Sequence, residues 1–409
     1  MSRALCVRLV VALGLGLGAV VLAGPALSHA RAADTARSSG TGAPAYLEDE
    51  IEAQAEMVGL EEVQRLLDEL NREMEAELPP LDLRSFVAAL LRGEAPYSFT
   101  GLVKAVGLRL IREVVANSWL LGRLVILAVL CGLLQAMQSA FAHHETSDLA
   151  FGVCYLVLVV LATGGFLAAL GVCRGVIDRL TDFMHAVLPV LVTLLAGLGA
   201  VTTAGLFSPV LVGAMEIVAW VIRDIVLPVV VAAAAVDLVS RTFTRIRLTA
   251  LADLLRLAAV VVTGTLLVLF VGLVGAYGAV GAVADGVALK AAKFAAGNLI
   301  PFIGKVLADA ADVVLGSSLV LKNAVGVVGV LAVLTYTVFP LLKVAAMVLV
   351  YRLAAALVQP LGVGELSGGL ASVATSLSLM TVVACGVGVL FVFTLAVLAG
   401  AATAVTGFR

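Results

Sequence analysis

Long apolar runs occupy most of the chain after residue 118, and short polar stretches separate them. A bilayer-spanning helix needs about 20 consecutive apolar residues, and several runs reach that length. The first two predicted spans cover residues 119–141 and 149–173, and apolar runs continue to residue 405. Backbone polar groups find no water inside a bilayer, so we expect these runs to be helical. The pattern predicts an all-α polytopic membrane helix bundle over residues 119–409.

Residues 1–32 have the pattern of an N-terminal signal peptide. Arg3 and Arg8 lie at its start, and an apolar core follows from Leu9 to Leu22. Ala30-Arg31-Ala32 then provides a small-x-small cleavage site. Cleavage at this site and retention as a signal anchor both stay open. Either outcome translocates the residues that follow.

Residues 33–118 predict a small helical extracytoplasmic region, with 16 acidic and 8 basic side chains. Its first part, residues 33–47, is rich in small and polar residues and predicts a flexible tether. Four apolar side chains then repeat at the spacing of one face of an amphipathic helix: Val63, Leu67, Leu70 and Met74. Under one interpretation this region packs on itself or on the membrane surface. Under the other it offers a docking surface to a partner.

Two prolines after residue 183 recur at a fixed spacing of 112 residues. The pairs are Pro189 with Pro301 and Pro228 with Pro340. This spacing raises the hypothesis of two duplicated units, at residues 183–285 and 295–405, an arrangement that many transport proteins use. The alternative is a chance alignment of prolines in a sequence rich in alanine and valine.

The most basic loop of the chain contains Arg241, Arg245 and Arg247. Counting every apolar run as a span places this loop outside the cell, whereas arginine-rich loops tend to stay in the cytoplasm. The conflict disappears if residues 186–206 enter and leave the membrane on its outer side. We treat this re-entrant segment as a hypothesis, and residues 296–318 are a candidate for the same behaviour.

A polar stretch at residues 294–329 interrupts the apolar sequence and supplies the candidate functional residues. Ionisable groups at membrane depth cost about 2.5–3.5 kcal/mol each, so they mark buried or water-lined positions. Lys305, Asp309 and Asp312 share one helix face, which suits an ion or proton path. The simpler interpretation is the solvated face of an amphipathic helix. The candidates are Asn298, Pro301, Lys305, Asp309, Asp312, Lys322 and Asn323.

The composition agrees with a membrane protein and gives no indication of nucleic-acid binding, disulfide bonds or metal sites. The chain is 62% hydrophobic and only 13% charged, against about 25% charged in soluble domains. Its net charge of −2 does not indicate nucleic-acid binding, and lipid is the expected surrounding. The cysteines and histidines lack disulfide or metal spacing. We interpret Arg223-Asp224 and Asp253 with Arg256 as local charge partners at helix ends.

Catalytic motifs are absent from the sequence. It has no phosphate-binding glycine loop, no nucleophile elbow and no zinc-protease motif. We therefore assign no catalytic, cofactor-binding or metal-binding residue, and we do not expect an enzyme.

Three groups of motifs resemble the stage III sporulation protein AE family. The first reads GNLIPFIGK at Gly297–Lys305 and LKNAVG at Leu321–Gly326, and the others are Val115–Phe141 and Val153–Val159. The resemblance covers nearly all of the chain after residue 48, and the signal-like start fits it as well. This chain is richer in alanine, valine and glycine than the family pattern, as genome composition bias produces.

The resemblance implies a role in endospore formation. The family belongs to a set of mother-cell proteins, AA to AH, that form a secretion-like channel complex in the outer forespore membrane. The AH protein connects this complex to stage II sporulation protein Q in the forespore membrane. The complex supports forespore development and late forespore transcription. The resemblance places the N-terminal region in the intermembrane space and carries over no catalytic residue.

Two other classes of function are weighed beside the channel subunit. An independent secondary transporter or permease with an internal repeat is favoured by the proline spacing and the polar stretch. A membrane-embedded enzyme is the third class, and no motif supports it.

Overall fold

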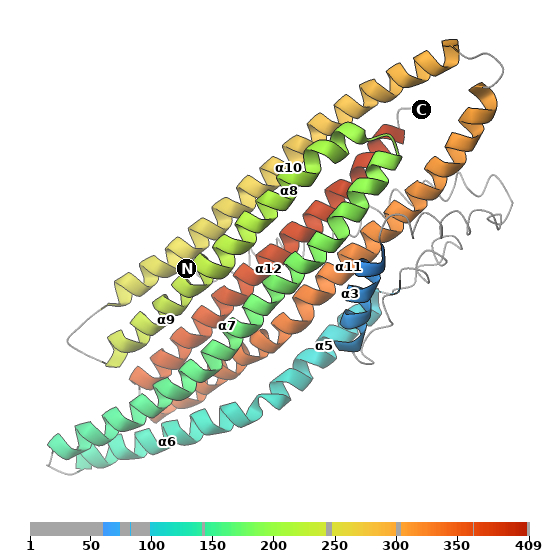
Figure 1. Ribbon diagram of the computed structural model, residues 1–409. Helices are drawn as coiled ribbons and strands as arrows, with labels where there is room; N and C mark the ends of the chain where they lie inside the picture. The colour runs from blue at the N-terminus through green and yellow to red at the C-terminus, as the bar shows by residue number, and fades with distance from the viewer. Residues whose placement is uncertain are drawn as a thin grey trace.

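The protein is an elongated bundle of long helices (Figure 1). The structure, a computed structural model, describes residues 60–73, 82, 99–140, 144–242, 248–299, 304–362 and 364–406. Every element within these residues is helical, which confirms the predicted all-α class. The predicted signal peptide lies outside them. The elements are α3 (Leu60–Glu73), α5 (Phe99–Ala116), α6 (Ser118–Ala140), α7 (His144–Gly197), α8 (Val201–Val221), η1 (Ile222–Val226), α9 (Leu227–Thr242), α10 (Thr249–Leu299), α11 (Gly304–Val358), η2 (Gln359–Leu361) and α12 (Gly364–Thr406).

Five helical stretches among the described residues are long and apolar enough to cross a membrane. They contain 37–44 residues each, or about 55–66 Å at 1.5 Å per residue. The pair α5 and α6, bent by 42° at Asn117, adds a sixth candidate if it crosses as one unit. The stretches are Leu156–Gly197, Val201–Arg241, Thr249–Asp285, Ser318–Leu361 and Gly364–Gly400. Because a bilayer core is about 30 Å thick, parts of these helices extend beyond it.

Helix α7 differs from the sequence prediction, which separated a span at 149–173 from a segment at 186–206. The structure has one continuous helix of 54 residues from His144 to Gly197, with Pro189 inside it. The chain turns only after this helix, where Gly199 has a φ of +86° that glycine adopts without strain. The intervening polar residues therefore belong to a helix and not to a connecting loop, and the re-entrant segment at 186–206 stays a hypothesis.

The second proposed re-entrant segment, 296–318, comprises the end of α10 and the first part of α11. The residues between these helices lie outside the described part of the chain, and they include Pro301. Its predicted counterpart, Pro189, lies inside α7. The two hairpins α9–α10 and α11–α12 follow each other along the chain, and the duplication stays a prediction.

Helix α12 lies at the centre of the bundle and packs against α7, α9, α10 and α11 (Figure 1). Small residues let these helices approach closely, as is common between membrane helices. A Cβ atom at Gly326 would lie 3.1 Å from Ala399 Cβ, and one at Gly386 would lie 3.5 Å from a methyl group of Leu267. The core is therefore an interface of small and branched apolar side chains.

Helix α3 connects the acidic N-terminal region to this bundle. Its predicted apolar stripe is confirmed over Val63, Leu67 and Leu70, which are all buried, while Met74 lies outside the described residues. The helix packs against α7 and α11. The Tyr336 hydroxyl donates a 2.8 Å hydrogen bond to the backbone carbonyl of Leu66. A charged amphipathic helix is thus docked midway along α11.

Candidate functional site: a charged band across the bundle

A band of charged side chains crosses the middle of the bundle on α7, α8 and η1. Four of its α7 members are spaced i, i+4, i+8 and i+11 and therefore share one side of that helix. All members lie inside stretches that are long and apolar enough to span a membrane. We call the set the charged band: Arg174, Asp178, Arg179, Asp182 and His185 on α7, Glu216 on α8, and Arg223 and Asp224 in η1.

Ion pairs join the two helices along this band. The Arg223 guanidinium lies 2.7 Å from Asp178 Oδ1 on α7 and 3.0 Å from Asp224 Oδ2 beside it. His185 Nε2 lies 3.0 Å from Glu216 Oε1. The side chains in these pairs are 39–53% exposed. In water such pairs stabilise a fold by about 0–1 kcal/mol, so their role in stability is small.

Local sequence explains why η1 presents charge at this place. Pro228 is the second residue of α9 and has no amide hydrogen, so the carbonyl one turn earlier lacks its usual donor. The helix forms a π turn over Ile222–Val226, and such turns are frequent at functional sites. Ile222 and Val226 are buried, while Arg223 and Asp224 between them point outward.

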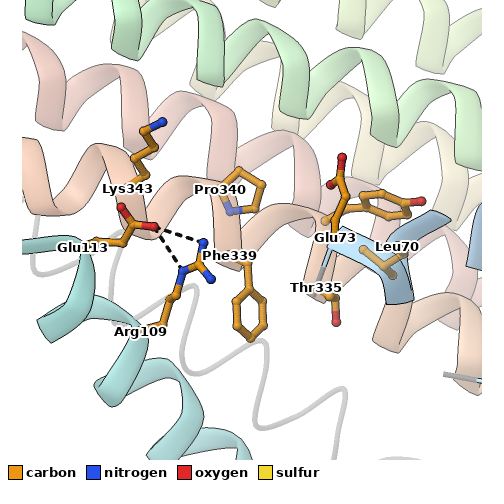
Figure 2. A pocket seen from close by; sticks show the side chains of 9 residues that line it. Leu70, Glu73, Arg109, Glu113, Thr335, Phe339, Pro340 and Lys343 are labelled. Atoms are coloured by element: carbon orange, nitrogen blue, oxygen red, sulfur yellow. Dashed lines mark hydrogen bonds and ion pairs between the residues drawn. The ribbon is translucent and has the colours of Figure 1, made fainter. Parts of the chain in front are cut away.

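A small pocket of about 110 Å³ adjoins the band between α3, α5 and α11 (Figure 2). Arg109 Nε donates a 3.1 Å hydrogen bond to Glu113 Oε1 at its edge, and Arg179 of the band pairs with Glu73. Ligand pockets usually measure about 300–1,000 Å³, so this one has room for a few water molecules only. Its lining comprises Leu70, Glu73, Arg109, Glu113, Thr335, Tyr336, Phe339, Pro340 and Lys343.

A second polar cluster is buried between α9, α10 and α12. Asp237 is 2% exposed, and its Oδ2 accepts a 2.9 Å hydrogen bond from Arg256 Nη2. The same Arg256 atom lies 2.8 Å from Ser372 Oγ and 3.2 Å from Ser376 Oγ, and the Ser372 hydroxyl donates to Asp237. Arg241 Nε lies 3.3 Å from Asp237 Oδ1. One carboxylate thus holds two arginines and a serine from three helices.

The interpretation of Arg256 as a partner of Asp253 alone is incomplete. That pair is present at 3.3 Å, but Asp253 is 49% exposed and the buried partner is Asp237. Sequence reasoning missed the cluster because Asp237 and Ser372 are 135 residues apart. The only local signal is the helical spacing of Asp237 with Arg241.

Asp285 of α10 caps the N-terminus of α8. Its carboxylate accepts hydrogen bonds from the backbone N–H groups of Thr202 at 2.8 Å and Thr203 at 3.0 Å, and from the Thr203 hydroxyl. Thr203 reaches this carboxylate because Gly281, one turn away on α10, has no side chain to block it. A carboxylate at a helix N-terminus satisfies amides that have no partner inside the helix.

Replacing Asp285 with alanine is expected to destabilise the protein by about 1–2 kcal/mol, the cost of losing a helix cap. Asp285→Asn keeps one acceptor oxygen and therefore one of the two amide hydrogen bonds, because Thr202 and Thr203 bond different oxygens of the carboxylate, and it is expected to lose less stability than the alanine variant. Thermal unfolding of the two variants in detergent measures the difference. Equal losses would contradict a capping role.

Of the predicted polar residues, Lys322 and Asn323 have described side chains, and both lie on α11, outside the charged band. Lys322 is fully buried, and its Nζ has no hydrogen-bond partner among the described residues, while Asn323 is half-buried. Lys322 lies two turns along α11 from Gly329, the position that faces Val187 of α7. Asn298 lies in the last turn of α10. The remaining candidates have side chains outside the described part of the chain, so the ion-path hypothesis stays a prediction: Pro301, Lys305, Asp309 and Asp312.

These features define a class, an all-helical polytopic membrane protein with charged side chains inside its candidate spans. No group of three or more histidine, cysteine or acidic side chains in the described residues has metal-site geometry. The chain belongs to the stage III sporulation protein AE family, whose pattern matches residues 81–402. The stage III sporulation protein AE of Bacillus subtilis (strain 168) is 36% identical over 287 residues, covering 70% of this chain and 72% of the relative. No solved structure matches the chain.

Proposed function

We propose that this protein is an integral membrane subunit of a multiprotein channel complex that links the mother cell and the forespore. Family membership supports a role in sporulation. The observation that carries the channel part is the charged band, because exposed ion pairs inside apolar spans need water or protein beside them. The complex would serve forespore development and late forespore transcription. Its other members would be the AA-to-AH proteins, with stage II sporulation protein Q as an indirect partner.

The proposed location is the mother-cell membrane, with the N-terminal region of the chain extracytoplasmic, and the helix order supports this orientation. If α5 and α6 cross as one bent unit, three spans precede the basic loop that begins at Arg241. A chain that starts outside is then in the cytoplasm at this loop, as the positive-inside tendency requires. The continuous α7 is what changes the count, because it replaces two expected spans by one.

Deleting the gene in its spore-forming host tests the sporulation role. We expect engulfed forespores to form, but the expression of late forespore reporter genes and the number of heat-resistant spores to fall sharply. A tagged full-length protein purified from sporulating cells is expected to bring other members of the AA-to-AH set with it. Normal spore yields after deletion would contradict the role.

The second candidate is an independent secondary transporter. Lys322 favours it, because its buried Nζ has no hydrogen-bond partner among the described residues, and unpaired ionisable groups mark transport sites in many membrane proteins. The two candidates differ in which proteins are expected to purify with this chain. A transporter would purify alone and retain its activity, whereas a channel subunit would purify with the other proteins. Purification without any member of the set would therefore favour the transporter.

A further inference from the structure

We propose that the charged band faces water at the middle depth of the membrane, so that α7 and α8 form one wall of an aqueous passage. This inference rests on the proposed function, which it deepens by naming the face of this chain that lines the conduit. Neighbouring chains of the complex would close the passage on its far side. Three observations carry the inference: the depth that α10 defines, the level of the band relative to α10, and the exposure of the band.

Helix α10 defines the position of the membrane. Every residue from Leu257 to Ala284 is uncharged, with Arg256 before this stretch and Asp285 after it. The stretch is about 42 Å long as a helix, close to the ~40–45 Å of a whole bilayer with its headgroups. Large apolar side chains are exposed near its middle, where Leu269 is 64% exposed. This part of α10 therefore lies near the midplane.

Side-chain contacts between neighbouring helices show which residues of α12 and α11 lie at the same depth as the middle of α10. Leu267 of α10 touches Gly386 of α12, because a Cβ there would lie 3.5 Å from a Leu267 methyl group. Two residues further along α12, Gly388 lies against Thr337 of α11. The midplane segment of α10 is thus level with Thr337.

The next contact reaches the band itself. Tyr336 precedes Thr337 on α11, and its ring centroid lies 5.7 Å from that of Phe183 on α7. Phe183 is flanked in sequence by band residues, with Asp182 before it and His185 two positions after it. The charged band and the apolar middle of α10 therefore occupy the same depth on different sides of one bundle.

Lipid tails cannot cover the band at this depth without a large cost. A charged side chain at the bilayer centre costs about 2.5–3.5 kcal/mol on insertion scales, and the band contains several. Asp182 is exposed, and Glu216 and Asp178 are 53% and 47% exposed. Water is the neighbour that satisfies both signs of charge without a matched partner. The band therefore marks a wet surface.

The docked α3 supports the same conclusion. Leu66 of this helix is bonded to Tyr336, so α3 lies at the level of the band. Its outer face carries Glu62 and Arg65, whose side chains are 60% and 78% exposed. This helix belongs to the N-terminal region that we propose to be extracytoplasmic, so its charged face is stable at mid-depth only where water from that side reaches it. It forms the edge of the wet surface on the α11 side.

The composition of the band indicates what such a passage would admit. Arginine, histidine, aspartate and glutamate alternate on it, so the wall concentrates neither anions nor cations strongly. A passage of this kind suits hydrated polar solutes of either charge.

Cysteine labelling tests the inference in the full chain within the assembled complex. Asp182→Cys and Leu269→Cys are introduced singly into a version without native cysteines, and membranes from sporulating cells are treated with a membrane-impermeant, charged thiosulfonate reagent. Both positions are exposed and level with each other. Because a thiol reacts as the thiolate, which forms in water, we expect Asp182→Cys to react at least about tenfold faster.

Each other outcome overturns the proposal. Slow reaction at both positions would mean that protein or lipid covers the band, and fast reaction at both would mean that this level lies outside the bilayer. Glu216→Cys on α8 provides a second band position if Asp182→Cys accumulates poorly. Spore yield and co-purification decide the proposed function separately, so either hypothesis can fail without the other.

Discussion

Replacing Asp237 with alanine is expected to destabilise the folded protein by about 3–5 kcal/mol, the cost of breaking a buried ion pair by removing one partner. Asp237 is 2% exposed and is the buried carboxylate that Arg256 and Arg241 contact. Without it, Arg256, whose side chain is only 12% exposed, loses its buried counter-charge. The cluster joins α9 and α10 to α12, so the loss should loosen the hairpin from the centre of the bundle. The temperature of unfolding in detergent and the amount of protein in membranes both measure the effect.

Asp253→Ala is the matched control, since it removes another carboxylate from the same Arg256. Asp253 is 49% exposed, and surface ion pairs contribute about 0–1 kcal/mol, so a small change is expected. Ser372→Ala offers a further check, because it removes a hydroxyl that donates to Asp237 and accepts from Arg256. Losing these two hydrogen bonds should cost about 1–3 kcal/mol. If Asp237→Ala and Asp253→Ala behave alike, the buried cluster does not hold the helices together.

Gly388→Ala is expected to cost about 1–3 kcal/mol through overpacking between α11 and α12. A Cβ at this position would lie 2.6 Å from Thr337 Cγ2 and 3.0 Å from Thr337 Cβ. Threonine is branched at Cβ, and its hydroxyl is held by a 2.7 Å hydrogen bond to the Val333 carbonyl. The neighbour therefore cannot rotate away, and the two helices must separate. Thermal unfolding in detergent measures the loss.

The double variant Gly388→Ala with Thr337→Ala should recover part of that loss, because Thr337→Ala removes both atoms nearest the new methyl group. Gly272→Ala on α10 is the control, since a Cβ there meets nothing within 4 Å. Alanine is the better helix former by about 1 kcal/mol, so this control should be neutral or stabilising. Equal destabilisation at both glycines would contradict the packing explanation.

Much of the helical architecture could be predicted from apolar spacing. The predicted start of the first span at residue 119 is within one residue of α6, which begins at Ser118. The stripe of Val63, Leu67 and Leu70 lies on the buried face of α3 as expected. These features depend on contacts within one helix or on hydrophobicity alone, and a short window of sequence is enough to predict both.

The candidate site was harder to predict, because its residues become neighbours only in the fold. Residues 174–185 are polar enough to resemble a link between spans, yet they continue α7 without a break. In the fold their charges meet partners on η1 and α3, which supply Arg223 to Asp178 and Glu73 to Arg179. A polar stretch between apolar runs has the same local pattern whether it forms a loop or a helix with charged neighbours.

The sequence by itself determined the class of this protein, its long apolar helices and its family, because each of these depends on composition, spacing or motifs along the chain. Only the tertiary structure decided which charges meet. Asp237 bonds Ser372 on α12, which is 135 residues away in the sequence. Asp285 bonds the N-terminus of α8, which is 82–83 residues away. Side-chain contacts of this kind are set by how helices pack, and packing depends on many small contacts at once.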